Sequence, residues 1–305
     1  MSKRKTGVDE ASPRWSWPWV RKEVRGYAEA LAIAYFVVTF LFTTVGVVGA
    51  SMLPTLDGGP GSRALVQSLL TGDRVFIPKY DTWLRRAGVL GDYQRGEIVV
   101  LRPPVNSPTA QLTGKRDFFI KRIVAVPGDS LRIEAGQVIV NGHLVDQAFL
   151  EARGVIEVAS VDFPVITQTG GRLTGMNVPF ITAGSTQVPR HTLAGDYPPA
   201  LEPDDARIQS YFGSTLAALA PLPADAPDGV PFVHEIVIPD GHYFVLGDNR
   251  SAGGSEDSRL FGPVPALSIA GQASAVIWPP RRDGEWNWRL LDIPDAFGAV
   301  SASGS

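Results

Sequence analysis

Hydrophobic positions are arranged in two different ways along the chain. Residues 30–48 form one continuous apolar run without a charged side chain, whereas the sequence after residue 51 consists of short apolar runs separated by turn residues. As a helix, the first run would extend roughly 28 Å, close to the ~30 Å hydrocarbon core of a bilayer. We therefore predict one transmembrane helix over residues 27–48, preceded by a basic N-terminal segment, 1–26.

The charges before the apolar run predict its orientation. Basic residues tend to stay on the cytoplasmic side of a membrane, and aromatic residues gather at the interface. The basic residues in question are Lys3, Arg4, Lys5, Arg14, Arg21, Lys22 and Arg25, and the aromatic ones are Trp15, Trp17, Trp19 and Tyr27. This pattern places the N-terminus inside and everything after Val48 outside.

Two other interpretations of the apolar run remain open. Val48, Gly49 and Ala50 satisfy the small-residue rule of a cleaved signal peptide, although the apolar region of such a peptide is typically only about 7–15 residues long. A buried core helix is the other, and the basic residues beside the run argue against it. Both are weaker interpretations than a membrane span.

The short runs after residue 51 read as β-strands, because they are rich in β-branched and aromatic residues and are bounded by Gly, Pro or Asp. They are residues 74–78, 97–101, 117–126, 130–134, 137–141, 234–238, 242–246 and 273–278. Asn141-Gly142 is a hairpin signal between two of them. The predicted fold class is mostly β.

The β body is interrupted by a segment of different composition. Residues 150–230 are rich in Pro, Gly, Ala, Thr and Asp, with one short helix expected near 211–220. We predict an inserted smaller lobe there, between a first part of the β core, 49–149, and a second part, 231–296. The small, polar residues 297–305 are predicted to be a disordered tail.

Composition excludes several classes of function. The 305 residues include no Cys, which rules out disulfides, thiolate metal sites and a cysteine nucleophile. The net charge of −3 gives no signature of nucleic-acid binding. None of the histidines, His143, His191, His234 and His242, has metal-ligand spacing, and we expect ordinary structural or surface roles for all four. Neither a metal nor a cofactor is predicted.

Ser51 and Lys121 are the two candidates for chemistry. A serine hydroxyl needs a base to take its proton, and Ser51 follows the apolar run directly. Lys121 lies in a strand with two mostly apolar faces, so its ammonium would lose solvation and its pKa would fall. A neutral lysine can act as a general base near pH 7. Alternatively, Lys121 reaches water or pairs with an acid, and the strand pattern does not decide between these roles.

A polar loop follows the apolar strand at 242–246. It includes Asp248, Asn249, Arg250, Ser255, Asp257, Ser258 and Arg259. Such a concentration of hydrogen-bonding groups after a buried strand predicts a structured network, with Asp257 and Arg259 as an ion pair.

Four stretches together resemble the conserved boxes of bacterial type I signal peptidases, in the same order and behind a membrane span. They are SMLPT at 51–55, GDRVFIPKY at 72–80, KRIVAVPGD at 121–129 and GDNR…SEDSR at 247–259. The resemblance is weakest over the first 25 residues and over 150–230. It implies a β-rich catalytic core with an inserted lobe, and a serine endopeptidase that works with a Ser/Lys dyad.

The resemblance also implies a role for each matching residue. Ser51 would be the nucleophile and Lys121 the general base, with Ser255 holding the lysine in place. Arg122 would be its structural neighbour, and Asp257 and Arg259 a supporting ion pair. The side chains implied to line shallow apolar substrate pockets are Val47, Met52 and Ile120.

The chain departs from the family pattern in two places. Some members have a serine two residues before the nucleophile, in the oxyanion hole, where this chain has Gly49. The oxyanion hole would then rest on the backbone N–H of Ser51 and a second backbone donor or a water. The loop before Ser255 is also two residues longer than the commonest spacing, so Ser251 and Ser258 remain alternatives for that role.

The function implied is removal of N-terminal signal peptides from exported preproteins, with cleavage after small residues (Ala-x-Ala). Its partners would be signal peptides and the lipid bilayer, with no nucleic acid, and the enzyme would be a monomer. The expected location is the bacterial inner membrane, with the catalytic domain on the periplasmic side. The alternatives are a specialised maturation peptidase of the same superfamily, a self-cleaving repressor on the same core, and an inactive membrane-anchored binding module.

Overall fold

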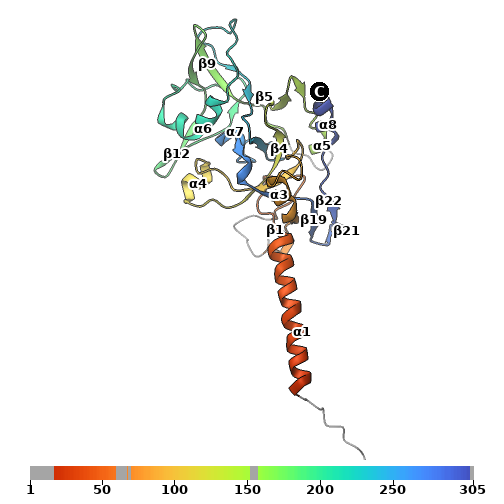
Figure 1. The fold of residues 1–305 in the computed structure, drawn as a ribbon. Helices are drawn as coiled ribbons and strands as arrows, with labels where there is room; N and C mark the ends of the chain where they lie inside the picture. Colours follow the sequence, from red (N-terminus) through yellow and green to blue (C-terminus); the bar gives the residue numbers. More distant parts are fainter. Residues whose placement is uncertain (1–16, 60–66, 68–69, 152–156, 303–305) are drawn as a thin grey trace, which may run out of the picture. The chain divides into compact units, whose positions relative to one another are not determined.

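The structure is a computed structural model that describes residues 17–59, 67, 70–151 and 157–302 (Figure 1). The chain divides after Phe42 into two compact units, 1–42 and 43–305. The first unit is helical, and the second contains the β-strands and the shorter helices. Each unit is described by itself.

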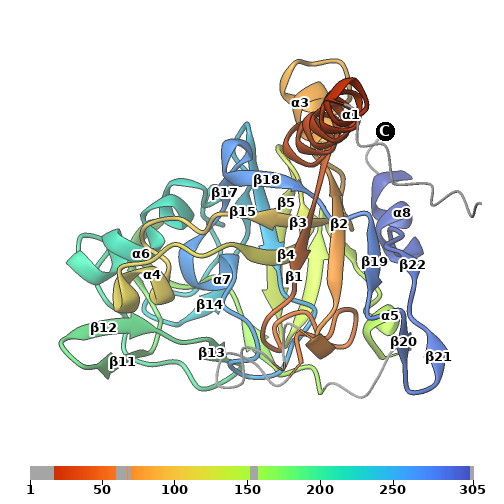
Figure 2. The same ribbon diagram turned by 90° about the horizontal axis from the view of Figure 1, so that it is seen from below.

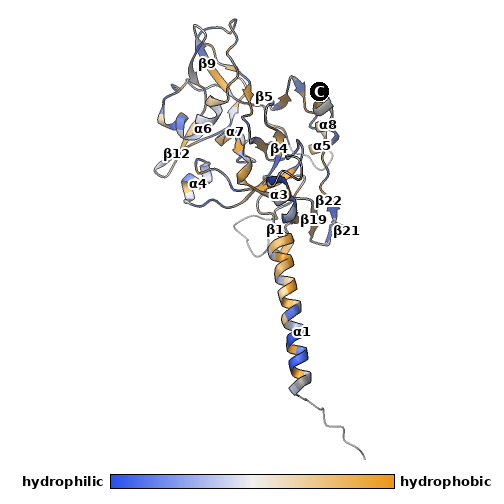
Figure 3. Ribbon diagram, in the orientation of Figure 1, coloured by the Kyte–Doolittle hydropathy of each residue, from blue (hydrophilic) through white to orange (hydrophobic). Residues whose placement is uncertain are grey.

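The first unit is one long apolar helix. α1 (Trp17–Phe36) continues into the π-helical turn η1 (Val37–Leu41). Its beginning is hydrophilic and its later turns are hydrophobic (Figure 3). Trp19–Leu41 is the one helix among the described residues with the length and composition to cross a membrane. Its 23 residues include the charged Arg21, Lys22, Glu23, Arg25 and Glu29, so the hydrocarbon core would hold its later turns. An 18-residue stretch extends roughly 27 Å at 1.5 Å per residue, close to the ~30 Å of that core.

The helix ends earlier than predicted. We expected a span over 27–48, but Phe42–Gly46 forms the strand β1, which lies beside β2 (Arg74–Pro78) in a sheet. Three consecutive β-branched residues, Thr43, Thr44 and Val45, favour an extended backbone here. The last part of the apolar run therefore belongs to the β body. Residues 1–16 of the predicted basic segment lie outside the described residues.

Antiparallel sheets build the second unit. The first large sheet has the order β1-β2-β19-β22, the second β17-β16-β4-β3-β18 and the third β15-β5-β6-β7. The strands not yet given are β3 (Ile98–Leu101), β4 (Phe119–Ala125), β5 (Ser130–Glu134), β6 (Gln137–Val140), β7 (His143–Leu144), β15 (Ile236–Val237), β16 (His242–Leu246), β17 (Val264–Pro265), β18 (Ile269–Gln272), β19 (Ala275–Trp278) and β22 (Arg289–Leu290). The mostly β fold is confirmed.

Smaller sheets and short helices complete this unit. One small sheet has three strands in the order β10 (Arg172–Met176), β9 (Val165–Thr169) and β14 (Phe232–Val233). The two-stranded sheets are β11 (Phe180–Ala183) with β12 (Thr186–Pro189), β13 (Thr192–Leu193) with β8 (Val161–Asp162), and β20 (Arg281–Arg282) with β21 (Glu285–Trp286). The helices are α3 (Lys79–Arg86), α4 (Pro108–Thr113), α5 (Ala148–Glu151), α6 (Ala206–Ala217), α7 (Ser258–Phe261), η3 (Ala266–Ser268) and α8 (Asp295–Ala302). In Figures 1 and 2, α6 and the β11–β12 ribbon lie on one side of the unit, opposite β21, β22 and α8.

The predicted hairpin at Asn141-Gly142 is confirmed. Val140 pairs with His143 across a two-residue loop whose residues have φ of 52° and 77°. A positive φ at both loop residues is the backbone that Asn-Gly favours in such turns.

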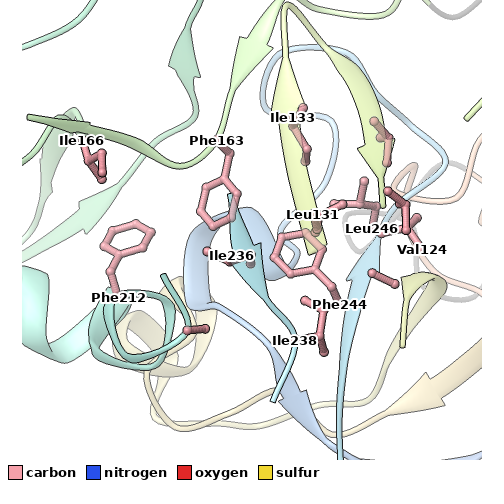
Figure 4. Close-up of a cluster of buried hydrophobic side chains, with 14 of the residues drawn as sticks. Val124, Leu131, Ile133, Phe163, Ile166, Phe212, Ile236, Ile238, Phe244 and Leu246 are labelled. Carbon is pink, nitrogen blue, oxygen red and sulfur yellow. The ribbon is translucent and has the colours of Figure 1, made fainter. Parts of the chain in front are cut away.

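Residues 150–230 share a core with the strands around them. The largest buried cluster contains Phe244 and Leu131 from the β body together with Phe163 and Phe212 from this segment (Figure 4). The rings of Phe163 and Phe244 lie 5.5 Å apart between centroids. The segment contains the expected helix, α6. The segment packs into the common core, and residues 43–305 form one compact unit.

The predicted disordered tail is wrong for residues 297–302. They belong to α8, whose Phe297 and Val300 are each 1% exposed and lie in the same core cluster. These two residues are three positions apart, so they share one face of the helix. Burial of this face holds an otherwise small and polar segment in place. Residues 303–305 lie outside the described residues.

Candidate active site

Lys121 lies on the central strand of the five-stranded sheet. β4 pairs with β3 on one side, where Lys121 is opposite Val99, and with β16 on the other. Every residue of β4 after Phe119 is buried, on both faces. The side chain of Lys121 is therefore desolvated, with only 3% of its surface exposed. The expectation of two covered faces is confirmed.

Ser51 lies in a turn that follows β1. The N–H of Val47 donates to the carbonyl of Asp73 (2.8 Å), which ties the end of β1 to the next strand. Asn249 holds the turn from the other side. Its backbone N–H donates to the carbonyl of Ser51 (3.1 Å), and its Nδ2 donates to the carbonyl of Ala50 (3.0 Å). Ser51 is thus fixed between the first sheet and the loop after β16.

The fold brings Ser51 and Lys121 together from positions seventy residues apart. Lys121 Nζ lies 2.8 Å from Ser51 Oγ, within hydrogen-bond distance, and also donates to the carbonyl of Ile120 at 3.0 Å. A nucleophile and a base at this separation are the geometry that general-base activation of a serine requires.

The surroundings of Lys121 lower its basicity. Burial disfavours the ammonium form and brings the pKa of Lys121 down to about 8, while the carboxylates of Asp257, Glu256 and Asp248 oppose that shift. An appreciable fraction of the amine is therefore neutral close to physiological pH, as a general base needs.

Asp257 and Arg259 form the predicted ion pair. Arg259 Nε and Nη2 donate to the two oxygens of Asp257 at 2.9 and 2.8 Å, and both side chains are buried. Asp257 also accepts from the N–H of Gly247 (3.1 Å). Burial would raise the pKa of the Asp257 carboxyl, but the Arg259 guanidinium holds it well below its ordinary value. The pair connects the loop after β16 to the beginning of α7.

Arg122 makes a second buried ion pair, with Asp248. Its Nε and Nη2 donate to the carboxylate at 2.8 and 2.6 Å, and its Nη1 donates to the carbonyl of Gly96 at 2.7 Å. The two side chains are 2% and 0% exposed. Burial opposes ionisation of Asp248, but the Arg122 guanidinium nonetheless lowers the pKa of that carboxyl. Arg122 thereby ties β4 to the end of β16.

Ser255 is close to the turn of Ser51 but makes no hydrogen bond to the lysine. It is 3% exposed, and its Oγ has no partner among the described residues. A Cβ added at Gly247 would lie 2.2 Å from Ser255 Oγ and 2.4 Å from the carbonyl oxygen of Ser51, so Gly247 separates these two residues without room for a side chain. The alternatives are occupied elsewhere: Ser251 Oγ donates to Asn249 Oδ1 (2.5 Å), and Ser258 Oγ accepts from the N–H of Val245 (3.0 Å).

Replacement of Ser255 by alanine should show whether the hydroxyl contributes to stability or to catalysis. A buried hydroxyl without a partner costs about 1–3 kcal/mol, so we expect Ser255→Ala to leave the free energy of unfolding unchanged or to raise it by about 1 kcal/mol. Denaturant unfolding measures this directly. A loss of more than about 1 kcal/mol would show that the hydroxyl has a partner in the folded protein. If Ser255 orients Lys121, kcat falls in the same stable variant.

The remaining predicted site residues surround Ser51. Val47, Met52 and Ile120 belong to one buried apolar cluster and are 4%, 1% and 8% exposed. Gly49 has φ +88°, and its backbone lies so close to Gly58 that a Cβ on Gly58 would be 2.2 Å from the Gly49 oxygen. A serine at position 49 would therefore adopt a left-handed backbone that residues with a side chain rarely adopt.

Two contributors to the site were missed from the sequence. Asn249 and Gly247 position the Ser51 turn, although only their membership of the polar loop pointed to them.

Among the described residues no three His, Asp or Glu side chains form a group that could hold a metal ion.

Comparison with known proteins identifies the family. A family model described as signal peptidase, peptidase S26, matches residues 21–278, and the chain belongs to this family. The predicted class of enzyme, a signal peptidase and hence a serine peptidase, is confirmed.

Curated relatives carry the same description. The probable signal peptidase I-2 of Synechocystis is 27% identical over 90% of this chain and 79% of its own length. The signal peptidase I of Pseudomonas fluorescens is 27% identical over 84% of this chain and 72% of its own length. The signal peptidase IB of Staphylococcus aureus strain COL is 25% identical over 85% of this chain and 92% of its own length. A crystal structure of a signal peptidase I from Enterococcus faecalis V583 aligns with 60% of this chain and 97% of its own, at 18% identity and a TM-score of 0.27, which is too low a likeness to add to the argument.

Proposed function

We propose that this chain removes N-terminal signal peptides from exported preproteins, with Ser51 as nucleophile and Lys121 as general base. The observation that carries the proposal is the 2.8 Å separation between Ser51 Oγ and a lysine amine that is buried almost completely. Family membership supplies the class of substrate.

The residues act in a fixed order. Neutral Lys121 accepts the hydroxyl proton as Ser51 Oγ attacks the scissile carbonyl, and the backbone N–H of Ser51 stabilises the developing oxyanion. Lys121 then returns the proton to the leaving amine, which leaves an acyl-enzyme. A water gives a proton to Lys121 as it attacks the ester carbonyl, and Lys121 then returns that proton to Ser51 Oγ as the ester bond breaks, which releases the signal peptide and restores the starting state. Arg122, Asp257 and Arg259 keep the strand and the loop around the dyad in place. A role of Ser255 in positioning the lysine would require a contact that forms with bound substrate, since its Oγ makes none with Lys121 here.

The substrate binds beside Ser51 as an extended strand. Backbone hydrogen bonds along a sheet edge give affinity, and pockets for alternate side chains give specificity. Val47, Met52 and Ile120 lie in one apolar cluster next to the turn of Ser51 and on the strand of Lys121. Because these side chains are almost completely buried, they offer little room to a substrate side chain, which favours small residues at positions −1 and −3.

The first unit anchors the enzyme in a bilayer. The later turns of the helix Trp19–Leu41 are apolar, and none of its most apolar stretch is buried within the protein. The excess of basic residues before it keeps the N-terminus in the cytoplasm, so the catalytic unit lies on the outer side of the bacterial inner membrane. The enzyme acts there as a monomer, on a substrate that is held in the same bilayer.

Cleavage of a purified preprotein in detergent tests this function. We expect one cut, after the Ala of an Ala-x-Ala site, identified by mass spectrometry of both products. The matched substrate has Phe in place of that Ala and should not be cut. Cleavage of both, or cleavage elsewhere, would show a peptidase without the proposed specificity, and no cleavage of several preproteins would favour a specialised maturation peptidase.

The pH profile tests the role of Lys121. Its pKa of about 8 predicts that kcat/KM rises about tenfold per pH unit below pH 8 and levels off above it, because only the neutral amine accepts the proton. A peptide assay between pH 6 and 10 measures this. Glu256→Gln removes a charge that raises this pKa, so the midpoint should move to lower pH. A midpoint near 6.5 that Glu256→Gln leaves unchanged would point to a histidine instead.

A further inference from the structure

A cavity of about 470 Å³ lies between the inserted segment and the polar loop. Its walls on one side are Ala252, Gly253, Ser255 and Glu256 from the loop. The inserted segment supplies the other side, with Pro179, Pro189, Arg190, His191, Leu193, Asp196 and Pro198. The volume is within the ~300–1,000 Å³ range of ligand pockets, and most of the lining is apolar, as in such pockets.

The cavity shares a loop with the site of Ser51 and Lys121. One loop, 249–257, forms both, since Asn249 holds the carbonyl of Ser51 while Ser255 and Glu256 line the cavity. Ser255 also packs on Gly247, directly beside the carbonyl of Ser51. The charge of Glu256 acts on Lys121 and raises its pKa.

The walls contain buried polar atoms without partners. Ser255 Oγ and both ring nitrogens of His191 have no hydrogen-bond partner among the described residues. Buried polar groups are nearly always paired. Ser255 and His191 both line the cavity, although the unpaired atoms themselves are buried, so a ligand in the cavity would complete them once these side chains rotate. A peptide backbone offers both the N–H and the carbonyl groups that a hydroxyl and a neutral imidazole can bind.

The direction of the chemistry identifies the occupant. Lys121 protonates the leaving amine, which is the new N-terminus of the mature part of the substrate. That part of the substrate therefore extends away from a point next to Lys121. Ser255 and Glu256 line the cavity, and the charge of Glu256 reaches Lys121. We propose, on the basis of the proposed function, that this cavity binds the first residues of the mature protein, downstream of the cleavage site, as an extended peptide. Its apolar wall, Leu193 with Pro179, Pro189 and Pro198, favours uncharged side chains there.

Two synthetic peptides with the same Ala-x-Ala site test the proposal. One continues for about six uncharged residues after the site, and the other ends one residue after it as an amide. Leu193→Asp places a charge in the apolar wall, and Ala252→Trp fills the cavity from an exposed loop position. Each should lower kcat/KM for the long peptide about tenfold, the size of effect that an apolar subsite contact gives, and leave the short peptide unchanged.

The control is Leu144→Asp. Leu144 and Leu193 are each the second residue of a two-residue strand and are 55% and 42% exposed, but only Leu193 lines the cavity. Equal losses on both peptides, or the same loss in Leu144→Asp, would overturn the proposal, and so would no loss on the long peptide. Cleavage of the short peptide by the wild type keeps the proposed function intact in each of these cases, whereas its absence would count against that function itself.

Discussion

Replacement of Ser51 by alanine or of Lys121 by methionine is expected to lower kcat for preprotein cleavage by at least about 10⁴-fold. The reason is that a serine without its base, or a base without its serine, retains only substrate binding and oxyanion stabilisation. The two side chains act as one unit across a 2.8 Å contact, so the double variant should lose no more than the worse single one. Single-turnover cleavage of the Ala-x-Ala preprotein measures all three.

The stability of Lys121→Met shows whether such a loss of activity is a loss of folding. The folded protein lowers the pKa of Lys121 from 10.5 to about 8, and one pKa unit corresponds to about 1.4 kcal/mol. At pH 7 both folded and unfolded states carry the proton, so the buried ammonium costs about 3 kcal/mol, which methionine removes. Lys121→Met should therefore unfold at a higher denaturant concentration than the wild type at pH 7. The difference in the free energy of unfolding should shrink as the pH rises from 8 to 10.5. An inactive variant that is also less stable would contradict this explanation.

Much of the β core could be predicted from local patterns. The strands at 74–78, 130–134 and 242–246 have the predicted bounds, because the second alternates and the other two are mostly apolar between clear turn residues. The pattern failed where tertiary packing decides the structure. The β-branched residues Thr43, Thr44 and Val45 only favour an extended backbone, and the pairing of Phe42–Gly46 with β2 makes it a strand. Phe297 anchors a tail that its own composition would leave unfolded.

The sequence supplied the candidate residues of the site but not their contacts. Ser51, Lys121, Asp257 and Arg259 were identified from the sequence, and the structure brings all four into one region through the loop after β16. The partner of Arg122, however, depends on the register in which Leu246 of β16 lies opposite Arg122 of β4. That register places Asp248, two residues further on, at the guanidinium, and no short-range pattern contains it.

Breaking the Arg122–Asp248 pair should have the largest effect on stability. Asp248→Leu leaves a guanidinium that is 2% exposed without its counter-ion, and loss of one partner of a buried pair typically costs about 3–5 kcal/mol. The double variant Arg122→Met/Asp248→Leu removes both charges and should recover part of that loss, since the desolvation cost disappears with the pair. The Gly96 carbonyl, which then lacks the donor from Arg122, limits the recovery. Denaturant unfolding of the two single variants and the double variant gives the coupling energy.

A matched surface pair makes the measurement decisive. Arg132 and Glu134 lie 3.6 Å apart with 38% and 56% of their side chains exposed, so Glu134→Leu should cost no more than about 1 kcal/mol. If Asp248→Leu costs as little, the buried pair contributes nothing beyond solvent-exposed charges. If Asp248→Leu loses about 3–5 kcal/mol, still unfolds cooperatively and has a lower kcat, the pair also positions β4. The strand that bears Lys121 is then held in register by the residue next to the base, and stability and catalysis depend on the same contact.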